Sequence, residues 1–513
     1  MKLTDRRAES ADIALLLEGT FPYVSGGVSS WVNQIIRAYQ EYRFAIVFMG
    51  SRPEDYGKPR FELPDNVVHF EEYYLYDDLN RNIKPASRRG DPGAMALGSR
   101  LHDKFTHKTS SAEAMLAFRE VAQAMLPGGQ LTLDDFLHSE LSWELICDRY
   151  RRFCTDPSFV DYFWTVRIMH QPLWKLAHIA KTLIPVRALH AVSTGYAGFL
   201  GALIHHSRGG LPLILSEHGI YTKERKIDLF KSEWIQDNRN VFQRDPTELS
   251  YFRQMWIGFF EWLGRCCYDA ADPIIALYEA NRLRQVADGA PAERTFNIPN
   301  GISLKRFTPL RDLRPADPPP ILCLIGRVVP IKDIKTFIRA MRRVANNMPE
   351  AEGWIAGPED EDPGYAQECH DLVRSLGLEN NVRFLGFQKI DDLMPKIGLT
   401  ILSSISEALP LVILEGYAAG VPTISTDVGS CRQLIEGLPG DDAAIGPSGA
   451  VVNIADPQAL ADASIALLSD YDRWRAASRA AIERVERYYT DTMMFGAYRK
   501  VFEGALERAP EPR

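Results

Sequence analysis

Gly326-Arg327, followed five residues later by Lys332, is the clearest candidate for chemistry in this sequence. These residues separate an apolar run that predicts a strand, 321–325, from a segment that predicts a helix, 333–346. Open parallel sheets bind ligands at the carboxyl ends of their strands. An arginine can bind two phosphate oxygens at once, and a lysine adds a point charge. We therefore expect Arg327 and Lys332 to bind a diphosphate rather than form a solvated basic loop.

Two glutamates, Glu407 and Glu415, form a second pattern, with seven residues between them. Pro410 suits the start of a helix over 411–419, so Glu407 would lie in the loop at the helix entrance and Glu415 inside the helix. Burying a carboxylate among the apolar neighbours of Glu415 is costly unless it has partners. Sugar and ribose hydroxyls would be suitable donors. The alternative is that each glutamate pairs with an arginine or caps a helix.

Two further motifs lie in the first half of the chain. Gly26 and Gly27 separate a predicted strand, 11–17, from a predicted helix. Their backbone could approach a ligand closely while the helix N-terminus offers N–H groups to a phosphate, although a tight turn would look the same. His218 follows a predicted strand directly, where it could donate a hydrogen bond to a ligand. A lone histidine is more often structural, but this place at a strand end favours a ligand contact.

One weaker pattern is easily over-interpreted. Asp360-Glu361-Asp362 matches the D-x-D arrangement that binds metal–diphosphate complexes. It lies in an acidic loop after Gly357-Pro358, so we interpret it as a solvated loop. The sequence contains no P-loop, no zinc-protease motif and no complete dinucleotide-binding motif.

The predicted elements alternate between strands and helices in two successive series. A proline-rich linker, 312–320, separates the series, and a helical insertion at about 71–160 interrupts the first one. The pattern predicts an α/β fold with two Rossmann-like domains facing a cleft. We expect one domain over 1–305, a second over 306–485, and a final helix over 486–513. The other predicted strands are 44–49, 188–192, 213–216, 273–276, 352–356, 382–384, 399–402 and 423–425, and the other predicted helices are 28–38, 111–126, 133–153, 194–205, 247–269, 365–376, 430–436, 457–468 and 471–508.

Length and composition narrow the class of protein. At roughly 150 residues per domain, 513 residues suggest about three domains. Hydrophobic residues make up 46% and charged residues 25%, which excludes a disordered or collagen-like chain. A net charge of −8 argues against a non-specific nucleic-acid coat. The seven scattered cysteines form no C-x-x-C pair, and the first residues lack an apolar signal segment, so we expect a cytoplasmic protein. The longest uncharged stretch, 188–207, predicts a strand and a buried helix rather than a membrane span.

Taken together, these residues resemble the family 4 glycosyltransferases, which are retaining enzymes of the GT-B fold. The matching residues follow the family order over nearly the whole chain: Gly26-Gly27, His218, Asn300-Gly301, Gly326-Arg327, Lys332, Glu407 and Glu415. Residues 18–31 and 217–225, with the long insertion, look more specifically like the members that build the bacterial Pel exopolysaccharide.

The resemblance implies that 1–305 is the acceptor-side domain, that 306–485 is the nucleotide-sugar domain, and that the helix over 486–513 returns to the first domain. It also implies a role for each motif around the donor. Arg327 and Lys332 would neutralise the diphosphate of a UDP-sugar, which is the leaving group, and Gly26 and Gly27 would contact the diphosphate or the sugar. No metal and no other cofactor is implied, because the two cations supply the positive charge.

The resemblance assigns the sugar and ribose contacts to other residues. Glu407 would bind the donor sugar, Glu415 the ribose hydroxyls, and His218 the sugar near its reacting carbon, while Asn300 adds a donor contact. Retention would follow from a front-face reaction in which the leaving phosphate accepts the acceptor's proton. The catalytic set is then His218, Glu407, Arg327 and Lys332.

This chain departs from the family after the first glutamate. Many relatives carry Phe-Gly where Leu409-Pro410 stands here. Proline has no N–H to donate, so the loop's contacts with the donor should come from the amides of Leu409, Leu411 or Val412.

The resemblance implies a retaining, metal-independent glycosyltransferase that extends the Pel chain. UDP-N-acetylgalactosamine is the first choice of donor, followed by UDP-glucose and UDP-N-acetylglucosamine. A transferase with a lipid or small-glycoside acceptor is the alternative. A non-catalytic nucleotide-sugar-binding scaffold and an epimerase are more distant ones, and a scaffold would be expected to lack Arg327, Lys332 or Glu407. The partners implied are a polysaccharide acceptor and the proteins of an inner-membrane synthesis and export complex that recruit the enzyme, with no nucleic acid.

Overall fold

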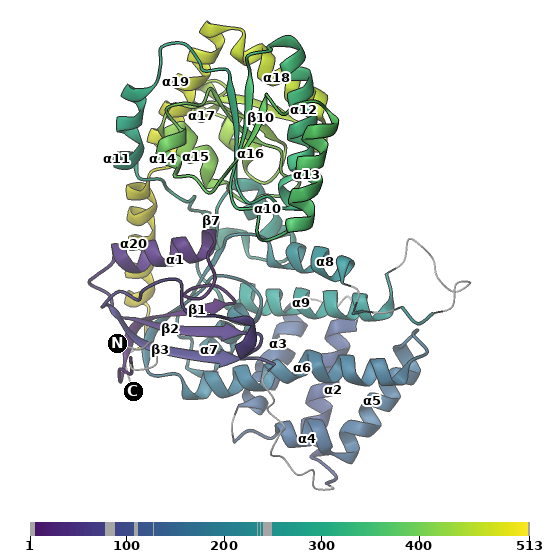
Figure 1. The fold of residues 1–513 in the computed structure, drawn as a ribbon. Coiled ribbons are helices and arrows are strands. Elements are labelled where there is room, and N and C mark those ends of the chain that lie inside the picture. The colour runs from purple at the N-terminus through teal and green to yellow at the C-terminus, as the bar shows by residue number, and fades with distance from the viewer. Residues whose placement is uncertain are drawn as a thin grey trace. The chain divides into compact units, whose positions relative to one another are not determined.

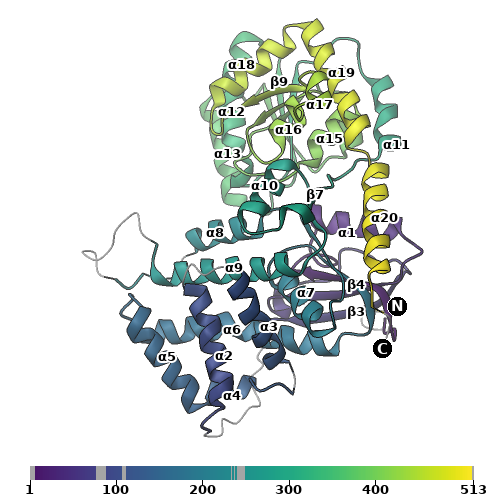
Figure 2. The same cartoon turned by 180° about the vertical axis from the view of Figure 1, so that it is seen from behind.

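A computed structural model describes residues 6–76, 88–106, 111–126, 128–232, 234–235, 237–239 and 249–510 of the chain. Parts of the predicted insertion (77–87, 107–110 and 127) and the start of the predicted helix 247–269 lie outside these ranges. The chain forms two compact units (Figures 1 and 2). Unit 1 comprises Met1–Ala276, Arg282–Phe296 and Arg499–Arg513, and unit 2 comprises Leu277–Asn281 and Asn297–Tyr498. The domain bounds expected from the sequence remain a prediction.

Unit 1 is built on a sheet with the order β3-β2-β1-β4-β5-β6-β7. The pairings from β3 to β6 are parallel. Helices on both faces bury such a sheet, which explains the near-continuous apolar run of β1. The strand order reverses between β1 and β4, which makes this the topological switch point. The strands are β1 (Ala11–Glu18), β2 (Phe44–Gly50), β3 (Val67–Tyr74), β4 (Val186–Ala191), β5 (Leu213–Glu217), β6 (Ile274–Ala276) and β7 (Thr295–Asn297).

The helices of this half form two groups. In the first group, α7 (Tyr196–Ser207) packs on β1, β4 and β5, and α9 (Tyr251–Ala270) packs on α7 and on α8 (Tyr221–Lys231). The first group also includes α1 (Gly27–Ala38) and α10 (Glu279–Ala287). The other makes up the predicted insertion and continues beyond it: α2 (Pro92–Thr106), α3 (Ser111–Met125), α4 (Leu133–His138), α5 (Glu140–Phe153) and α6 (Phe159–Thr182).

Besides α2 and α6, which the sequence analysis did not predict, the insertion differs from the expectation at β3 and at Ser139. Its first residues belong to β3, which the sequence analysis did not anticipate because the strand carries charges. The buried Glu71 of β3 is accommodated because it accepts hydrogen bonds from His69 Nε2 and Tyr73 Oη, each 2.8 Å away. The helix predicted over 133–153 is divided at Ser139, whose hydroxyl caps α5 by accepting a hydrogen bond from the Ser142 amide at 3.1 Å.

Unit 2 contains a fully parallel sheet with the order β10-β9-β8-β11-β12-β13. Five of its strands were predicted, and the short β13 was not. The strands are β8 (Ile321–Ile325), β9 (Glu352–Ala356), β10 (Val382–Gly386), β11 (Leu399–Leu402), β12 (Thr423–Thr426) and β13 (Gly449–Val452). The larger helices are α12 (Ile334–Asn347), α13 (Pro363–Ser375), α15 (Leu411–Ala418), α16 (Cys431–Glu436), α18 (Pro457–Leu468), α19 (Tyr471–Tyr488) and α20 (Asp491–Glu507), of which α20 continues into unit 1.

These observations confirm the predicted fold class, an α/β protein with two Rossmann-like parts. The uncharged stretch 188–207 forms most of strand β4 and helix α7, as expected. Within the described part of the chain, no helix combines the length and the apolar character that crossing a bilayer requires. All seven cysteines are free.

Candidate active site

The predicted diphosphate residues, Arg327 and Lys332, lie beyond the carboxyl end of β8. The strand order of the unit 2 sheet reverses between β8 and its neighbour β11. Arg327 follows β8 closely, Lys332 ends a short 3₁₀ turn before α12, and Ser403 directly follows β11. Two hydrogen bonds join the loops after these strands. Ser403 Oγ donates to the Lys332 carbonyl and the Ile405 amide donates to the Ile331 carbonyl, both at 2.9 Å. The loops that carry Lys332 and Glu407 therefore form one structure.

Lys332 and Glu407 form an ion pair, with Nζ 2.6 Å from Oε1. Ser404 Oγ donates a hydrogen bond to the same carboxylate oxygen, also at 2.6 Å. The side chains of Lys332 and Glu407 are only 20% and 15% exposed. The structure thus brings together two residues from separate sequence motifs. A ligand that reaches one of them also meets the other.

Arg327 has a different partner. Its Nη1 lies 2.6 Å from both carboxylate oxygens of Glu361, and the two side chains are 55% and 49% exposed. Glu361 belongs to the acidic loop that we interpreted as solvated. Its neighbour Asp362 caps α13 by accepting a hydrogen bond from the Tyr365 amide at 3.0 Å. An exposed ion pair is worth about 0–1 kcal/mol, so a diphosphate could displace Glu361 from Arg327.

The N-terminus of α15 lies next to Glu407 in the chain. Pro410 is the N-cap of the helix, and the amides of Leu409, Leu411 and Val412 donate to no residue in the described ranges. Gly429 packs against the loop in front of this helix. A Cβ at Gly429 would lie 2.3 Å from the Glu407 carbonyl oxygen, and its φ of 55° already favours glycine. The loop therefore holds its amide donors open at the positive end of a helix.

Glu415, on the second turn of α15, is partly buried. Its carboxylate makes no hydrogen bond or ion pair with any residue that the structure describes. Burial raises the pKa of Glu415 to about 7, although the charge of Arg306 opposes this rise. A partly buried acceptor without a donor suits a ligand that brings hydroxyl groups.

Asn300 and Gly301 differ in what they do in unit 2. Gly301 packs against the link between α19 and α20, where a Cβ would lie 2.2 Å from the Thr490 carbonyl oxygen. This close packing explains why position 301 requires a glycine. Asn300 is 7% exposed, and its buried Oδ1 has no hydrogen-bond partner among the described residues. Asn300 thus keeps an acceptor that a ligand could use.

In unit 1, His218 follows β5 and lies beside α1. The rings of His218 and Trp31 meet edge to face, with their centroids 4.6 Å apart. Burial lowers the pKa of His218 to about 4, so its imidazole is neutral at pH 7. Its buried Nε2 has no hydrogen-bond partner among the described residues. A neutral imidazole with an unused ring nitrogen can donate or accept one hydrogen bond.

Gly26 and Gly27 stand at the N-terminus of α1, which also carries Trp31. A Cβ added at either glycine would meet nothing within 4 Å, and neither has a left-handed φ. Neither packing nor backbone strain within the chain explains these glycines. Close approach of a ligand remains a sufficient reason for them.

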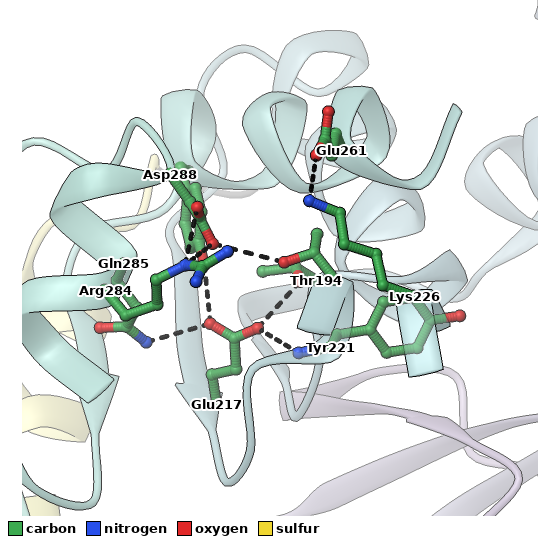
Figure 3. A network of polar contacts seen from close by, with 10 residues as sticks. Thr194, Glu217, Tyr221, Lys226, Glu261, Arg284, Gln285 and Asp288 are labelled. Atoms are coloured by element: carbon green, nitrogen blue, oxygen red, sulfur yellow. Dashed lines mark hydrogen bonds and ion pairs between the residues drawn. The ribbon is translucent and has the colours of Figure 1, made fainter. Parts of the chain in front are cut away.

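Glu217, the residue before His218, is fully buried at the centre of a network of donors (Figure 3). It accepts hydrogen bonds from Tyr268 Oη at 2.8 Å, Thr194 Oγ1 at 3.0 Å, the Tyr221 amide at 3.1 Å and Gln285 Nε2 at 3.1 Å. Burial raises the pKa of Glu217, and the four hydrogen bonds act in the opposite direction. These contacts join the segments around α7, α8, α9 and α10 to the end of β5 just before His218.

The predicted site residues therefore belong to two different units. Lys332, Glu407 and the start of α15 lie together in unit 2, whereas Gly26, Gly27 and His218 belong to unit 1. Within the ranges that the structure describes, no group of three or more His, Cys, Asp and Glu side chains could hold a metal ion. The roles assigned to individual site residues, and metal independence, remain predictions.

The sequence analysis overlooked Ser404 and Gly429, and it placed Glu361 in a solvated loop without recognising it as the partner of Arg327. Ser404 could have been found, because it lies two residues beyond a predicted strand in the second series. The glycine at 429 and the partner of Arg327 have no local sequence signal, since each depends on a contact between distant segments.

Two family models match the chain. Residues 11–293 match the family described as Domain of unknown function (DUF3492), and residues 308–484 match Glycosyl transferases group 1. Among curated proteins, an exopolysaccharide phosphotransferase of Streptomyces coelicolor is 29% identical over 249 residues, 48% of this chain and 24% of the relative. A D-inositol 3-phosphate glycosyltransferase of Thermobispora bispora is 28% identical over 257 residues, 47% of this chain and 58% of the relative. The chain thus spans less than two thirds of the length of either relative.

The solved structures include similar folds. HepE of Anabaena, crystallised in complex with UDP, aligns over 96% of this chain and 100% of its own, with a TM-score of 0.55 and 14% identity. At this identity the likeness concerns the fold alone, and it agrees with the two parallel sheets described above.

Proposed function

We propose that this chain, which belongs to the family described as Domain of unknown function (DUF3492), is a retaining glycosyltransferase that transfers a sugar from a nucleotide sugar. The match of residues 308–484 to Glycosyl transferases group 1 supports the transferase class. The retaining, metal-independent mechanism is part of the proposal, as is membership of the family 4 group.

The observation that carries the proposal is the arrangement at the edge of the unit 2 sheet. Lys332 and Glu407 lie 2.6 Å apart, and the open amides of Leu411 and Val412 follow Glu407 by four and five residues, at the start of α15. Cations and helix N-terminal amides bind a diphosphate, while carboxylates accept hydrogen bonds from sugar hydroxyls. One small region therefore offers groups for both parts of a nucleotide sugar.

In the proposed reaction, the bond between the sugar's anomeric carbon and the diphosphate oxygen breaks. The acceptor oxygen bonds to that carbon from the same face, and its proton passes to the departing diphosphate. Arg327 and Lys332 stabilise the negative charge that develops on the diphosphate, and Glu415 orients the nucleoside through the ribose hydroxyls. Glu407 positions the donor sugar. His218, neutral at pH 7, hydrogen-bonds the sugar near its reacting carbon.

The finer proposal concerns substrates. Residues 18–31 and 217–225 resemble PelF, the glycosyltransferase of the bacterial Pel exopolysaccharide system, and one matched relative bears an exopolysaccharide name. UDP is supported by the UDP complex of the structurally similar HepE. We propose UDP-N-acetylgalactosamine as the first donor to test, then UDP-glucose and UDP-N-acetylglucosamine, with a growing Pel chain as acceptor. A small acceptor is the alternative, which the inositol phosphate glycosyltransferase among the relatives favours.

The proposed location is the cytoplasm, with recruitment to an inner-membrane polysaccharide synthesis and export complex through other proteins. Co-purification of the chain with the membrane proteins of that system, in the presence and absence of each candidate partner, would test this part.

The test of the activity is product analysis by mass spectrometry and NMR after incubation of the purified chain with each UDP-sugar and an oligosaccharide acceptor. We expect transfer with retention of the donor's anomeric configuration. Arg327→Ala and Glu407→Ala should abolish transfer while the protein stays folded. Arg339→Ala and Glu379→Ala, which remove exposed charges elsewhere in unit 2, are the matched controls and should stay active. Transfer retained in either site variant would overturn the assignment.

A further inference from the structure

The helical insertion of unit 1 contains a cavity of about 170 Å³ lined by residues of α4, α5 and α6. Most of its lining is apolar, including Leu145, Ile146 and Val166. Trp143 and Phe163 also line it, and Trp143 is 54% exposed. The volume is slightly larger than the ~150 Å³ apolar cavity that takes up benzene in an engineered protein core. The cavity can therefore hold a ring or a short hydrocarbon chain.

Three polar side chains line the same cavity without a complete set of partners. Arg167 makes no hydrogen bond or ion pair with a residue in the described ranges, and its guanidinium lies 5.8 Å from the centre of the Trp164 ring. The hydroxyl of the buried Tyr162 has no hydrogen-bond partner there either. His138 Nε2 is buried and unpartnered. Buried polar atoms in native proteins normally have partners, so the unused His138 Nε2 requires an explanation, and Arg167 and the Tyr162 hydroxyl lie around the same cavity.

The charges of the cavity are not balanced by its own residues. Arg149, the other cation in the lining, pairs with Asp103 and donates to the Ser99 hydroxyl at 2.8 Å. Arg167 has no such carboxylate, and burial lowers its pKa below the ordinary value. An anion placed at Arg167 would restore a charge-assisted contact that the chain itself does not supply.

We propose that this cavity binds an amphiphile with an apolar body and one anionic group, such as a phosphate or a carboxylate. The apolar body occupies the space between α4, α5 and α6, and the anionic group meets Arg167, with Tyr162 and His138 as further hydrogen-bond partners. Such a pocket, apolar with a few convergent polar groups, has the composition of a small-molecule site. None of its residues belongs to the proposed transferase machinery, so the site is separate from it.

The size of the cavity favours a small amphiphile over a polypeptide. A partner helix would need a long groove, whereas the space here is a pocket of about 170 Å³ between three short segments of α4, α5 and α6. A free amphiphile and a lipid in a membrane present the same chemistry, and the experiment has one arm for each.

Isothermal titration calorimetry of the full chain with octyl phosphate tests the proposal, with octanol and inorganic phosphate as comparison ligands. We expect octyl phosphate to bind at least about tenfold more tightly than either, because a hydrogen bond to a charged group adds to apolar burial. Arg167→Gln should weaken octyl phosphate about tenfold and leave octanol unchanged. Arg152→Gln, on the exposed face of α5, is the matched control and should bind as the unchanged chain does.

Ile146→Trp fills the apolar part of the cavity and should abolish the binding of both octyl phosphate and octanol. If this variant does not fold, as judged by its thermal melting, Arg167→Gln decides the question alone. In the second arm, sedimentation with phosphatidylglycerol vesicles identifies a membrane lipid as the source if binding depends on Arg167, and a free amphiphile if only octyl phosphate binds. Failure of octyl phosphate to bind, or binding unaffected by Arg167→Gln, would overturn the proposal.

Discussion

Lys332 Nζ and Glu407 Oε1 lie 2.6 Å apart although the residues are separated by 75 positions, three strands and two larger helices. Ser404 donates to the same oxygen of Glu407, so the carboxylate is held from two sides. Both side chains are mostly buried, which makes the contact stronger than an exposed ion pair and makes the loss of either partner costly. The position of each residue therefore depends on the other, before any donor binds.

This dependence can be measured with a double-mutant cycle of Lys332→Met and Glu407→Gln. We expect each single variant to lower the free energy of unfolding by about 1–3 kcal/mol, since the remaining partner stays buried without its contact. The double variant should lose less than the sum, with a coupling of about 1 kcal/mol or more. Arg343→Met breaks an exposed pair with Asp462 and should cost under about 0.5 kcal/mol in urea unfolding. Strict additivity of the two site variants would contradict the expectation.

A second expectation concerns Glu361, whose carboxylate forms an ion pair with the Arg327 guanidinium. Because this exposed pair competes with a diphosphate, Glu361→Gln should tighten UDP binding by up to about fivefold, equivalent to about 1 kcal/mol. Titration calorimetry with UDP at low salt is the measurement. Glu368→Gln, which breaks the pair with Lys335 in the same unit, should leave the affinity unchanged. Weaker binding by the Glu361 variant would mean that Glu361 supports the donor site instead of competing for it.

A third expectation follows from the raised pKa of Glu415, about 7 against an ordinary value of 4.5. Between these values the folded protein binds more protons than the unfolded chain, so stability falls as pH rises through this window. Glu415→Gln removes the titration. As the pH rises from 4.5 to 8, the unchanged chain should therefore lose about 1–3 kcal/mol more in its free energy of unfolding than the variant does.

The same variant should bind UDP more weakly, since an amide is a poorer acceptor for ribose hydroxyls than a carboxylate. Urea unfolding at the two pH values and UDP titration together check both effects. Glu483→Gln, on the exposed face of α19, should show neither change. An identical pH dependence in the Glu415 variant would count against the buried, unpaired state of this carboxylate.

A fourth expectation separates a ligand requirement from a folding requirement at Gly27. A Cβ there meets nothing within 4 Å, so Gly27→Ala should leave the free energy of unfolding unchanged or raise it by up to about 1 kcal/mol. The KM for the donor should nevertheless rise about tenfold or more if a ligand approaches the backbone closely. Gly301→Ala is the contrasting variant, because its Cβ would collide with the Thr490 carbonyl, and it should lower stability instead. An unchanged KM would remove Gly27 from the donor site.

The sequence was sufficient to predict features that depend on a single strand or helix and its flanking residues. The strand 321–325, the helix behind it and the position of Lys332 between them follow from apolar patterning, and the structure contains them. The same holds for Glu415 on α15, since Pro410 and the apolar run after it mark a helix start.

The remaining features depend on contacts between distant segments. β3 escaped notice because Glu71 is charged, and only its contacts with His69 and Tyr73 make it acceptable there. The partner of Arg327 lies 34 positions along the chain, in a loop whose acidic composition is typical of solvated segments. Gly429 is required by the carbonyl of Glu407, a contact that no periodicity encodes.

The network around Glu217 limits which of its residues can be substituted independently in related proteins. Its carboxylate has four donors from four separate segments, and each of them is matched to an acid at that one position. Replacing Glu217 alone would leave Tyr268 and Gln285 as buried donors without an acceptor. Thr194, Glu217, Tyr268 and Gln285 should therefore be inherited as a set, and a relative that has lost one of them should have exchanged the others as well.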